Sequence, residues 1–260
     1  MTKKTISRSI VHTLGFLSRL PLPAHWYGGS DESLQDHAYA FPLAGAVLGA
    51  IGAFSLIIAS QLGLPPMGAA LITFLTLAFI TGALHEDGLS DTADGFFGGS
   101  TQTRRLEIMK DSHIGTFAAI TLIGTIGLKT IFLATIIEKS GAQSAALAII
   151  AIEAASRAAM MSLWYKLPSA RAGGLSDKIG APSLETTQTA LIIGVGILGI
   201  GFTIIASVAT FLFALLVAIL ILWGFANLSL AKIGGQTGDV LGSAQQITVL
   251  SLLLGLVISL

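Results

Sequence analysis

Seven apolar stretches make up most of this sequence, and each is about as long as a lipid bilayer is thick. A helix that crosses the hydrocarbon layer needs roughly 20 mostly apolar residues. The stretches that meet this requirement lie at 41–61, 66–84, 115–137, 142–164, 188–206, 209–231 and 244–260. The pattern predicts an all-α integral membrane protein with about seven transmembrane helices. No polar linker divides the chain, so residues 1–260 are predicted to form a single polytopic membrane domain.

The composition agrees with a lipid environment and excludes several kinds of site. Charged residues make up only 11% of the chain and hydrophobic residues 53%, whereas about a quarter of the residues in soluble domains are charged. The absence of cysteine excludes disulfides, thiolate metal sites and a cysteine nucleophile. A formal net charge of zero argues against nucleic acid as a partner.

The first 40 residues have a different pattern from the spans. Apolar residues recur there at helical spacing, but no long apolar core or small-residue cleavage site typical of a signal peptide is present. We therefore expect an interfacial N-terminal segment, residues 1–40, with an amphipathic helix lying on the membrane. An ordinary soluble helix is the alternative. The apolar positions are Ile6, Ile10, Val11, Leu14, Leu17 and Leu20.

Basic residues gather on one side of the predicted spans. If the N-terminus is cytoplasmic, 11 of the 14 lysine and arginine residues fall in cytoplasmic segments. The loops on the opposite side, such as 61–66, are short and nearly uncharged. The positive-inside rule therefore places the N-terminus and the acidic residues discussed next in the cytoplasm.

The predicted cytoplasmic loop at 85–114 contains four acidic residues within nine positions, in a chain that has only 14. Three of them, Asp87, Asp91 and Asp94, are spaced i, i+4, i+7. On a helix continuing from the preceding span they would share one face, where their charges would repel one another unless a cation lay among them. A solvated acidic loop without a ligand is the alternative.

Magnesium is the cation that this set of side chains suits. Mg²⁺ prefers hard oxygen ligands and commonly binds a few carboxylates together with substrate phosphates. We therefore predict that Asp87, Asp91 and Asp94 bind the metal, and that Asp111 supplies a fourth carboxylate from across the loop. His85, beside the cluster, is a candidate base or simply a loop histidine.

Basic residues near the acidic cluster are candidate phosphate ligands. Arg104, Arg105 and Lys110 follow it in "TRRLEIMKDS", where they could hold phosphate oxygens or merely balance charge. Arg157 lies about two turns inside its predicted span and could meet a phosphate from below. A structural pair between Arg157 and Glu153, one turn away, is the alternative.

A second cytoplasmic motif, at 232–243, contains the glycine-rich run "KIGGQTGDVLG". Its glycines could turn backbone amides toward an anion. Asp239 within it is a candidate ligand for substrate or metal, and a simple connector is the alternative.

Together these segments resemble one family, cobalamin-5′-phosphate synthase, also called adenosylcobinamide-GDP ribazoletransferase. The resemblance runs nearly end to end, but the family tends to carry two glutamates where this chain has Gln246 and Val249. Glu86 and Glu153 also differ from the usual occupants and are assigned no role. The matching segments are "FLSRLPLP" (Phe16–Pro23), "FPLAGAVLGA" (Phe41–Ala50), "HEDGLSDTADG" (His85–Gly95), "RRLEIMKDSHIGT" (Arg104–Thr116), "SR" (Ser156–Arg157) and "GGQTGDVLG" (Gly234–Gly242).

The resemblance implies a Mg²⁺-dependent phosphotransferase of the bacterial cytoplasmic (inner) membrane. Such enzymes complete the nucleotide loop of vitamin B12. The 3′-hydroxyl of α-ribazole, or of its 5′-phosphate, attacks the cobinamide-linked phosphate of adenosylcobinamide-GDP and releases GMP. The products are adenosylcobalamin or its 5′-phosphate.

The same resemblance implies roles for the candidate residues. The aspartates named above would hold Mg²⁺, the basic residues would grip the diphosphate, and Asp239 would bind metal or ribazole. His85 or Asp94 would take the proton of the attacking hydroxyl. The expected partners are both substrates and the lipid bilayer, with a homo-oligomer or a complex with other cobalamin assembly enzymes left open.

Two other functions remain compatible with parts of the sequence. The run "D-x-x-D-G" at Asp91–Gly95 also begins the metal motif of membrane phosphotransferases that use CDP-alcohols, but the alanine and arginine that continue that motif are absent. A transporter could use Lys129, Glu153 and Arg157 to line a path. Transporters often contain an internal repeat, and the sequence shows no convincing one.

Overall fold

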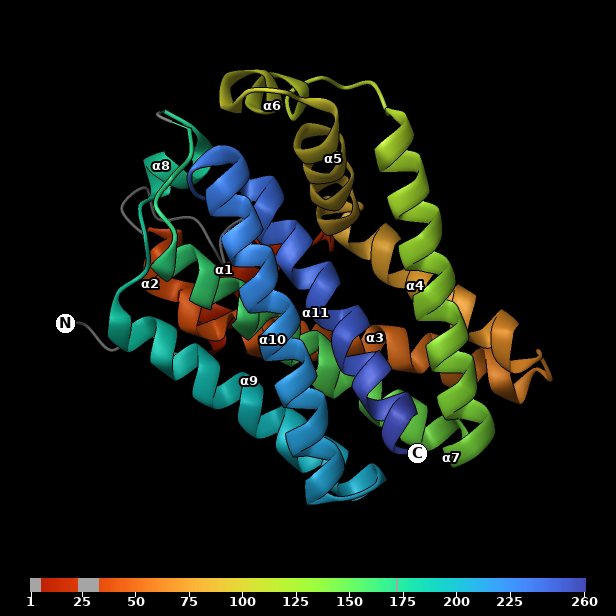
Figure 1. Ribbon diagram of the computed structural model, residues 1–260. Coiled ribbons are helices and arrows are strands. Elements are labelled where there is room, and N and C mark those ends of the chain that lie inside the picture. Colours follow the sequence, from red (N-terminus) through yellow and green to blue (C-terminus); the bar gives the residue numbers. More distant parts are fainter. Residues whose placement is uncertain (1–5, 23–32, 172) are drawn as a thin grey trace.

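The computed structural model describes residues 6–22, 33–171 and 173–260, and this part of the chain is almost entirely helical (Figure 1). No β-strand is found among the described residues; the only strand-like pairing there is an isolated bridge between Ser169 and Gln236. The helices are α1 (Ile6–Leu17), α2 (Leu34–His37), the 3-10 turn η2 (Ala38–Ala40), α3 (Phe41–Gln61), α4 (Pro66–Thr81), α5 (Leu84–Gly98), α6 (Gln102–Ile108), α7 (Thr116–Lys166), α8 (Leu175–Ile179), α9 (Leu184–Ile205), α10 (Val208–Ile233) and α11 (Gly238–Ser259).

The long helices have the length and surface expected of membrane spans. In the described part of the chain, five helices are long and apolar enough to cross a bilayer, or six if α4 and α5 together form one bent crossing. Large apolar side chains such as Phe79, Ile123 and Trp223 are more than two-thirds exposed, as lipid-facing residues would be. The fold class is therefore confirmed, whereas the count of seven spans is not reached by this criterion.

The difference in span count arises mainly at α7. Its 51 residues would extend about 75 Å as one helix, more than twice the thickness of the hydrocarbon layer. Gly141 interrupts it with φ 85° and ψ 162°, a conformation open to glycine but strained for other residues. Figure 1 shows that the chain turns back sharply within α7. The halves on either side of Gly141 correspond to the two spans predicted at 115–137 and 142–164.

Small residues bring α3 against the second half of α7. A Cβ atom on Gly49 would lie 2.9 Å from the Cα of Ile150, so only glycine permits this separation of the two backbones. Close packing of this kind replaces the hydrophobic driving force that is missing between helices in lipid. A core of buried apolar residues from α3, α4, α7, α9, α10 and α11 continues through the middle of the molecule.

The chain bends sharply where the second predicted span ends. Gly82 and Ala83 both adopt left-handed conformations, with φ 64° and 55°, and α5 leaves α4 at 92°. The expectation that the aspartates lie on a helix was right, but that helix does not continue the span at 66–84. Since α5 carries four acidic residues, we place it at the membrane surface rather than in the hydrocarbon layer. Figure 1 shows α6 at one end of the molecule, with α5 directly below it.

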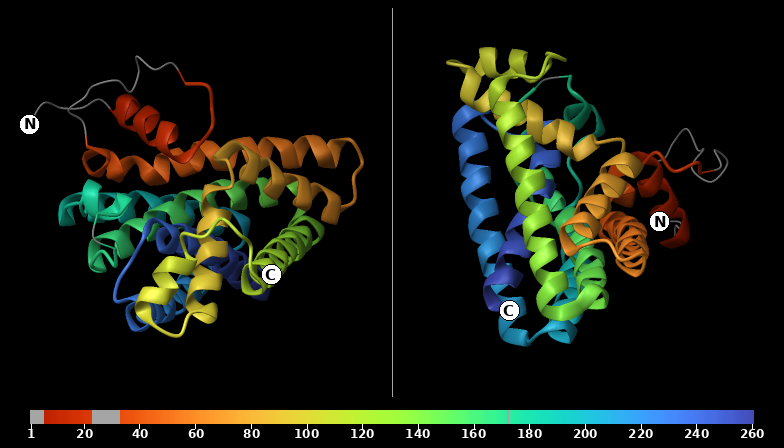
Figure 2. Two further views of the ribbon diagram at one scale, coloured as in Figure 1. Left: turned by 90° about the horizontal axis from the view of Figure 1, so that it is seen from above. Right: turned by 90° about the vertical axis from the view of Figure 1, so that its right-hand side faces the viewer.

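Helix α1 lies against the start of α3 and against α2 and η2 (Figure 2). It buries Leu14 and Leu17 on its inner face and leaves Ile6 and Phe16 exposed on its outer face. An amphipathic helix is therefore present as expected. The remainder of the predicted interfacial segment includes residues 1–5 and 23–32, which lie outside the described residues.

Candidate active site

The three aspartates of α5 meet the second motif at the start of α11. Gly88 makes this contact possible, because a Cβ atom there would lie 2.8 Å from the carbonyl oxygen of Asp239 and 3.0 Å from its Cα. The hydroxyl of Ser243 donates a hydrogen bond to the carbonyl oxygen of Gly88 at 3.0 Å. The two acidic motifs, about 150 residues apart in the sequence, thus form one site.

Asp91 is at the electrostatic centre of this cluster. Its pKa is raised from the ordinary value of 3.8 to about 7, and burial is the largest cause of this rise. Three neighbouring carboxylates add to the rise by repulsion, in order of effect those of Asp87, Asp239 and Asp94. This is the like-charge repulsion that the i, i+4, i+7 spacing predicts, now with a fourth carboxylate from α11.

Arg171 provides positive charge at the cluster, and we did not identify it from the sequence. Its charge opposes the rise in the pKa of Asp91, and its Nη2 donates to the carbonyl oxygen of Leu106 at 2.9 Å. The segment before it pairs with the second motif, because Ala170 N donates to Gln236 O and Gln236 N donates to Pro168 O, both at 2.8 Å. Neither hydropathy nor spacing indicated this position, which in the sequence is one more basic residue in a loop.

Asp94 has a structural role in addition to its place in the cluster. Its carboxylate accepts hydrogen bonds from Gly115 N at 2.6 Å and Ala118 N at 2.9 Å, which satisfies free N–H groups in the first turn of α7. Each carboxylate oxygen still has a lone pair available for a further partner. Asp94 therefore fixes α5 to α7 while facing the other carboxylates.

The three basic residues on α6 and just after its end divide into two groups. Arg104 lies at the surface and pairs with Glu107 at 3.1 Å, and Lys110 is also exposed. Arg105 instead donates from Nη1 to the carbonyl oxygen of Lys232 at 3.0 Å, at the C-terminal end of α10. In this arrangement Arg105 holds α6 against α10, and of these three residues Arg104 and Lys110 have the more exposed side chains.

Asp111 does not join the other carboxylates in this structure. It lies in the connection between α6 and α7, where its Oδ1 is 2.6 Å from Nδ1 of His113. That hydrogen bond lowers the pKa of Asp111. The charged neighbours that act on it are His113 and Arg104, and Asp111 is not among the groups that act on Asp91.

A second polar cluster, which we call the buried network, lies deeper between α5, α7 and α11. Arg157 is 1% exposed and its guanidinium donates to the carboxylate of Glu153, so the structural pair considered as an alternative is present. Gln245 Nε2 donates to Glu153 Oε2 at 3.3 Å and to Ser156 Oγ at 3.1 Å. Arg157 is therefore bound to protein groups here rather than open to a phosphate.

The buried network continues to Lys129 and Glu86. Lys129 Nζ donates to Gln246 Oε1 at 2.6 Å, and Gln246 Nε2 donates to Glu86 Oε1 at 3.0 Å. A glutamine at 246 can make both bonds, because its amide both donates and accepts. Residues of the buried network line a small cavity, and His85 lines it too. His85 is 2% exposed, and its Nε2 has no hydrogen-bond partner among the described residues. Its burial removes it from the open cluster where we expected a base.

Comparison with known proteins agrees with this assembly of motifs. The profile of the cobalamin-5-phosphate synthase family matches residues 9–257. The chain belongs to this family. Proteins named adenosylcobinamide-GDP ribazoletransferase from Brucella canis, Brucella suis and Brucella abortus are each 52% identical to it over 260 residues, with both chains covered completely. No solved structure matches.

The carboxylates at the site of this cobalamin-5-phosphate synthase family member are the kind of oxygen ligand that Mg²⁺ prefers. In the described part of the chain, no three carboxylate or imidazole groups are close enough to enclose a metal by themselves. Mg²⁺ does not require such an enclosure, because it retains water and commonly binds one or two carboxylates plus substrate phosphates. Repulsion from Asp87, Asp239 and Asp94 contributes, after burial, to the raised pKa of Asp91, and a divalent cation would relieve that repulsion.

The contact at Gly88 gives a testable prediction for the site. In Gly88→Ala the new methyl group would meet the backbone of Asp239, which cannot turn aside, so α5 and α11 must separate. We expect a loss of about 1–3 kcal/mol in stability and a loss of catalytic activity. The matched control on the same helix is Gly98→Ala, where the nearest atom would be 3.7 Å away. Equal activity in the two variants would show that the close contact of α5 with α11 is not needed.

Proposed function

We propose that this chain transfers the phosphocobinamide group of adenosylcobinamide-GDP to the 3′-hydroxyl of α-ribazole or α-ribazole 5′-phosphate. A ribose oxygen forms the new bond to phosphorus, the bond to GMP breaks, and the hydroxyl proton is released. The names of the full-length relatives support the reaction. The observation that carries it to this site is the convergence of Asp91 and Asp239 from the two acidic motifs.

The proposed Mg²⁺ would bind one or two carboxylates of the set Asp87, Asp91, Asp94 and Asp239, together with phosphates of the substrate. When bound, it would neutralise charge on the diphosphate and on the departing GMP. Asp94 is already oriented by its hydrogen bonds to α7. Because Asp87 and Asp91 lie on the same helix, these bonds also fix their positions. A base for the ribose hydroxyl belongs among these carboxylates rather than at His85, whose ring is buried.

Positive side chains at the edge of the cluster would bind the diphosphate of the substrate. Arg171 is the best placed, because its charge already acts on Asp91. Arg104 on α6 and Lys110 just after its end are exposed and could reach a large substrate from that side. Arginine suits this role because its planar donor fork matches phosphate oxygens. The same proposal places the site at the cytoplasmic face of the bacterial inner membrane, with the N-terminus on that side.

The test of this function is GMP release by the purified, detergent-solubilised protein. The protein would receive adenosylcobinamide-GDP and α-ribazole 5′-phosphate together, each substrate alone, and both with EDTA in place of Mg²⁺. We expect release only with both substrates and Mg²⁺. Release of GMP without ribazole would indicate hydrolysis instead of transfer, and no release from well-folded protein would overturn the proposal.

A further inference from the structure

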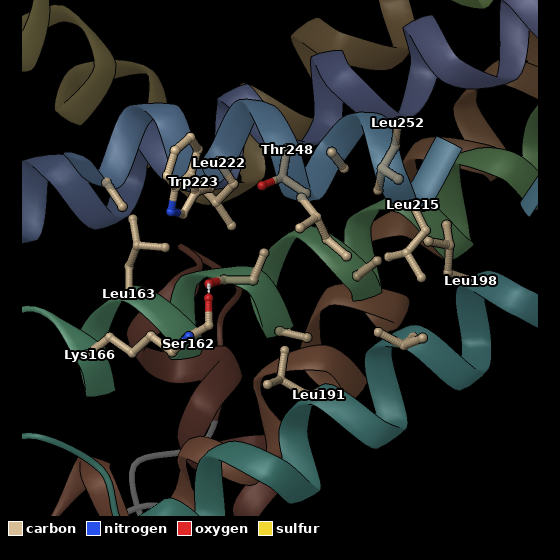
Figure 3. Close-up of a pocket in the computed structure, with 17 residues that line it drawn as sticks. Ser162, Leu163, Lys166, Leu191, Leu198, Leu215, Leu222, Trp223, Thr248 and Leu252 are labelled. Carbon is tan, nitrogen blue, oxygen red and sulfur yellow. Dashed lines mark hydrogen bonds between the residues drawn. The ribbon is translucent and has the colours of Figure 1, made fainter. Parts of the chain in front are cut away.

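A long apolar groove between α9 and α10 has no part in the site described above. Its volume is about 420 Å³, and its floor is formed by the second half of α7 with Thr248 and Leu252 of α11. Figure 3 shows side chains from all four helices pointing into it. Apart from Ser162, Lys166, Thr248 and the indole of Trp223, its lining is apolar.

The groove has the length of one leaflet of a bilayer. Its lining extends along α7 from Ala155 to Lys166 and along α10 from Leu215 to Ala226. Each of these distances is about 16 Å at the rise of an α-helix, and half of the hydrocarbon layer is about 15 Å. Ile219 and Trp223, at the edge of the groove, are 55% and 69% exposed, so it is accessible from the lipid side.

An apolar groove of this kind does not hold water, which needs polar partners. In a bilayer, the acyl chains of the surrounding lipids are available to fill it. A second copy of this protein is less suited, because a continuous groove one leaflet long matches a single flexible chain better than the ridged surface of a helix.

Lys166 decides which kind of lipid fits. It is the last residue of α7 and lies at one end of the groove. Within the described part of the chain its ammonium group forms no ion pair, and no acidic residue lines the groove. A positive charge at the end of a leaflet-long apolar channel complements a phosphate attached to an acyl chain.

We propose that this groove binds one acyl chain of an anionic phospholipid, with the lipid phosphate against Lys166. The bound chain would fill the space between α9 and α10 and support their separation. This inference concerns a lipid site and does not depend on the reaction proposed above.

Trp223 offers a direct probe, because bromine atoms on a lipid chain quench tryptophan fluorescence on contact. The protein would carry Trp26→Phe and Trp164→Phe, which leaves Trp223 as the only one of the three tryptophans. It would be placed in bilayers of unlabelled phosphatidylcholine containing a small fraction of brominated phosphatidylglycerol or brominated phosphatidylcholine. We expect quenching to require about fivefold less phosphatidylglycerol, as one lysine at an anionic headgroup implies.

Two variants separate the site from general lipid contact. Lys166→Gln should abolish the preference for phosphatidylglycerol, whereas Lys139→Gln, at an exposed lysine outside the groove, should preserve it. Ala159→Phe, which fills the groove from α7, should weaken quenching by both lipids. Equal quenching by the two lipids, or an unchanged preference in Lys166→Gln, would overturn the proposal.

A second measurement covers the case in which the tryptophan substitutions impair folding. The melting temperature of the otherwise unmodified chain would be compared in detergent with added phosphatidylglycerol or phosphatidylcholine. We expect phosphatidylglycerol to raise it more, with the difference lost in Lys166→Gln and retained in Lys139→Gln. A difference that persists in Lys166→Gln would place the lipid elsewhere.

Discussion

Asp91→Asn is expected to abolish GMP release while leaving the protein folded. Asparagine has nearly the same shape as aspartate, so the packing of α5 against α11 is retained. The variant loses the carboxylate at the centre of the cluster, on which Asp87 and Asp239 act. Because a metal ion can stabilise a transition state by several kcal/mol, we expect a loss of at least about 100-fold in kcat/KM.

Asp111→Asn is the matched control for this variant. Asp111 was predicted from the sequence as a ligand of the same metal, but it pairs with His113 in the structure. We expect its activity to stay within about threefold of the unsubstituted protein, since a surface pair of this kind contributes little. A large loss in Asp111→Asn would show that the loop between α6 and α7 closes over the site during the reaction. Full activity in Asp91→Asn would refute the assignment of the metal.

Asp91→Asn is also expected to change the stability of the protein when EDTA removes the metal. A carboxyl group with a folded-state pKa of about 7 binds its proton more tightly than in the unfolded chain, where the pKa is about 3.8. Its contribution to stability is therefore greatest at low pH and decreases as the pH rises from about 4 to about 7. Melting curves should show Asp91→Asn to be more stable than the unsubstituted protein at about pH 8, and this gain should shrink toward about pH 5. A gain independent of pH would contradict the raised pKa.

Arg157→Met is expected to be the most destabilising of the proposed substitutions. It removes the cation from a pair whose side chains are 1% and 5% exposed, and so leaves the carboxylate of Glu153 buried without compensation. Breaking a buried pair in this way costs about 3–5 kcal/mol. The expected observations are a lower melting temperature in detergent and a low yield of folded protein.

A double substitution distinguishes loss of the pair from loss of packing. Arg157→Met combined with Glu153→Gln removes both charges, and Gln245 can still bond to an amide at 153. We expect the double variant to be more stable than Arg157→Met alone, with a coupling energy of about 1–3 kcal/mol. Equal stability of the single and double variants would mean that lost packing, and not the unpaired charge of Glu153, causes the destabilisation.

The candidate site was only partly predictable from the sequence. The stripe of Asp87, Asp91 and Asp94 follows from helical spacing, and the structure places it on a helix as expected. Asp239 was identified as a candidate, but its contact with the stripe was not. Gly88 makes that contact possible. Neither hydropathy nor spacing in the sequence indicates which residue of another helix will pack against a given glycine.

The roles of the basic residues were the least predictable part. Arg105 and Arg157 have the side chains that a phosphate site requires, yet one binds the backbone of α10 and the other binds Glu153. An arginine satisfies its donors with the nearest acceptor, whether a phosphate, a carboxylate or a backbone carbonyl. The sequence specifies the donors, but only the packing of α6 on α10 specifies which acceptor is near.

The sequence by itself determined the membrane class, the approximate positions of the spans, and the acidic stripe. These features depend on hydropathy and helical periodicity, which act over a few turns of one helix. Only the tertiary structure decided the 92° bend after α4, the meeting of α5 with α11, and the place of Arg171 beside Asp91. These features depend on contacts between segments far apart in the chain, where backbone separation and competition for hydrogen-bond partners decide the outcome.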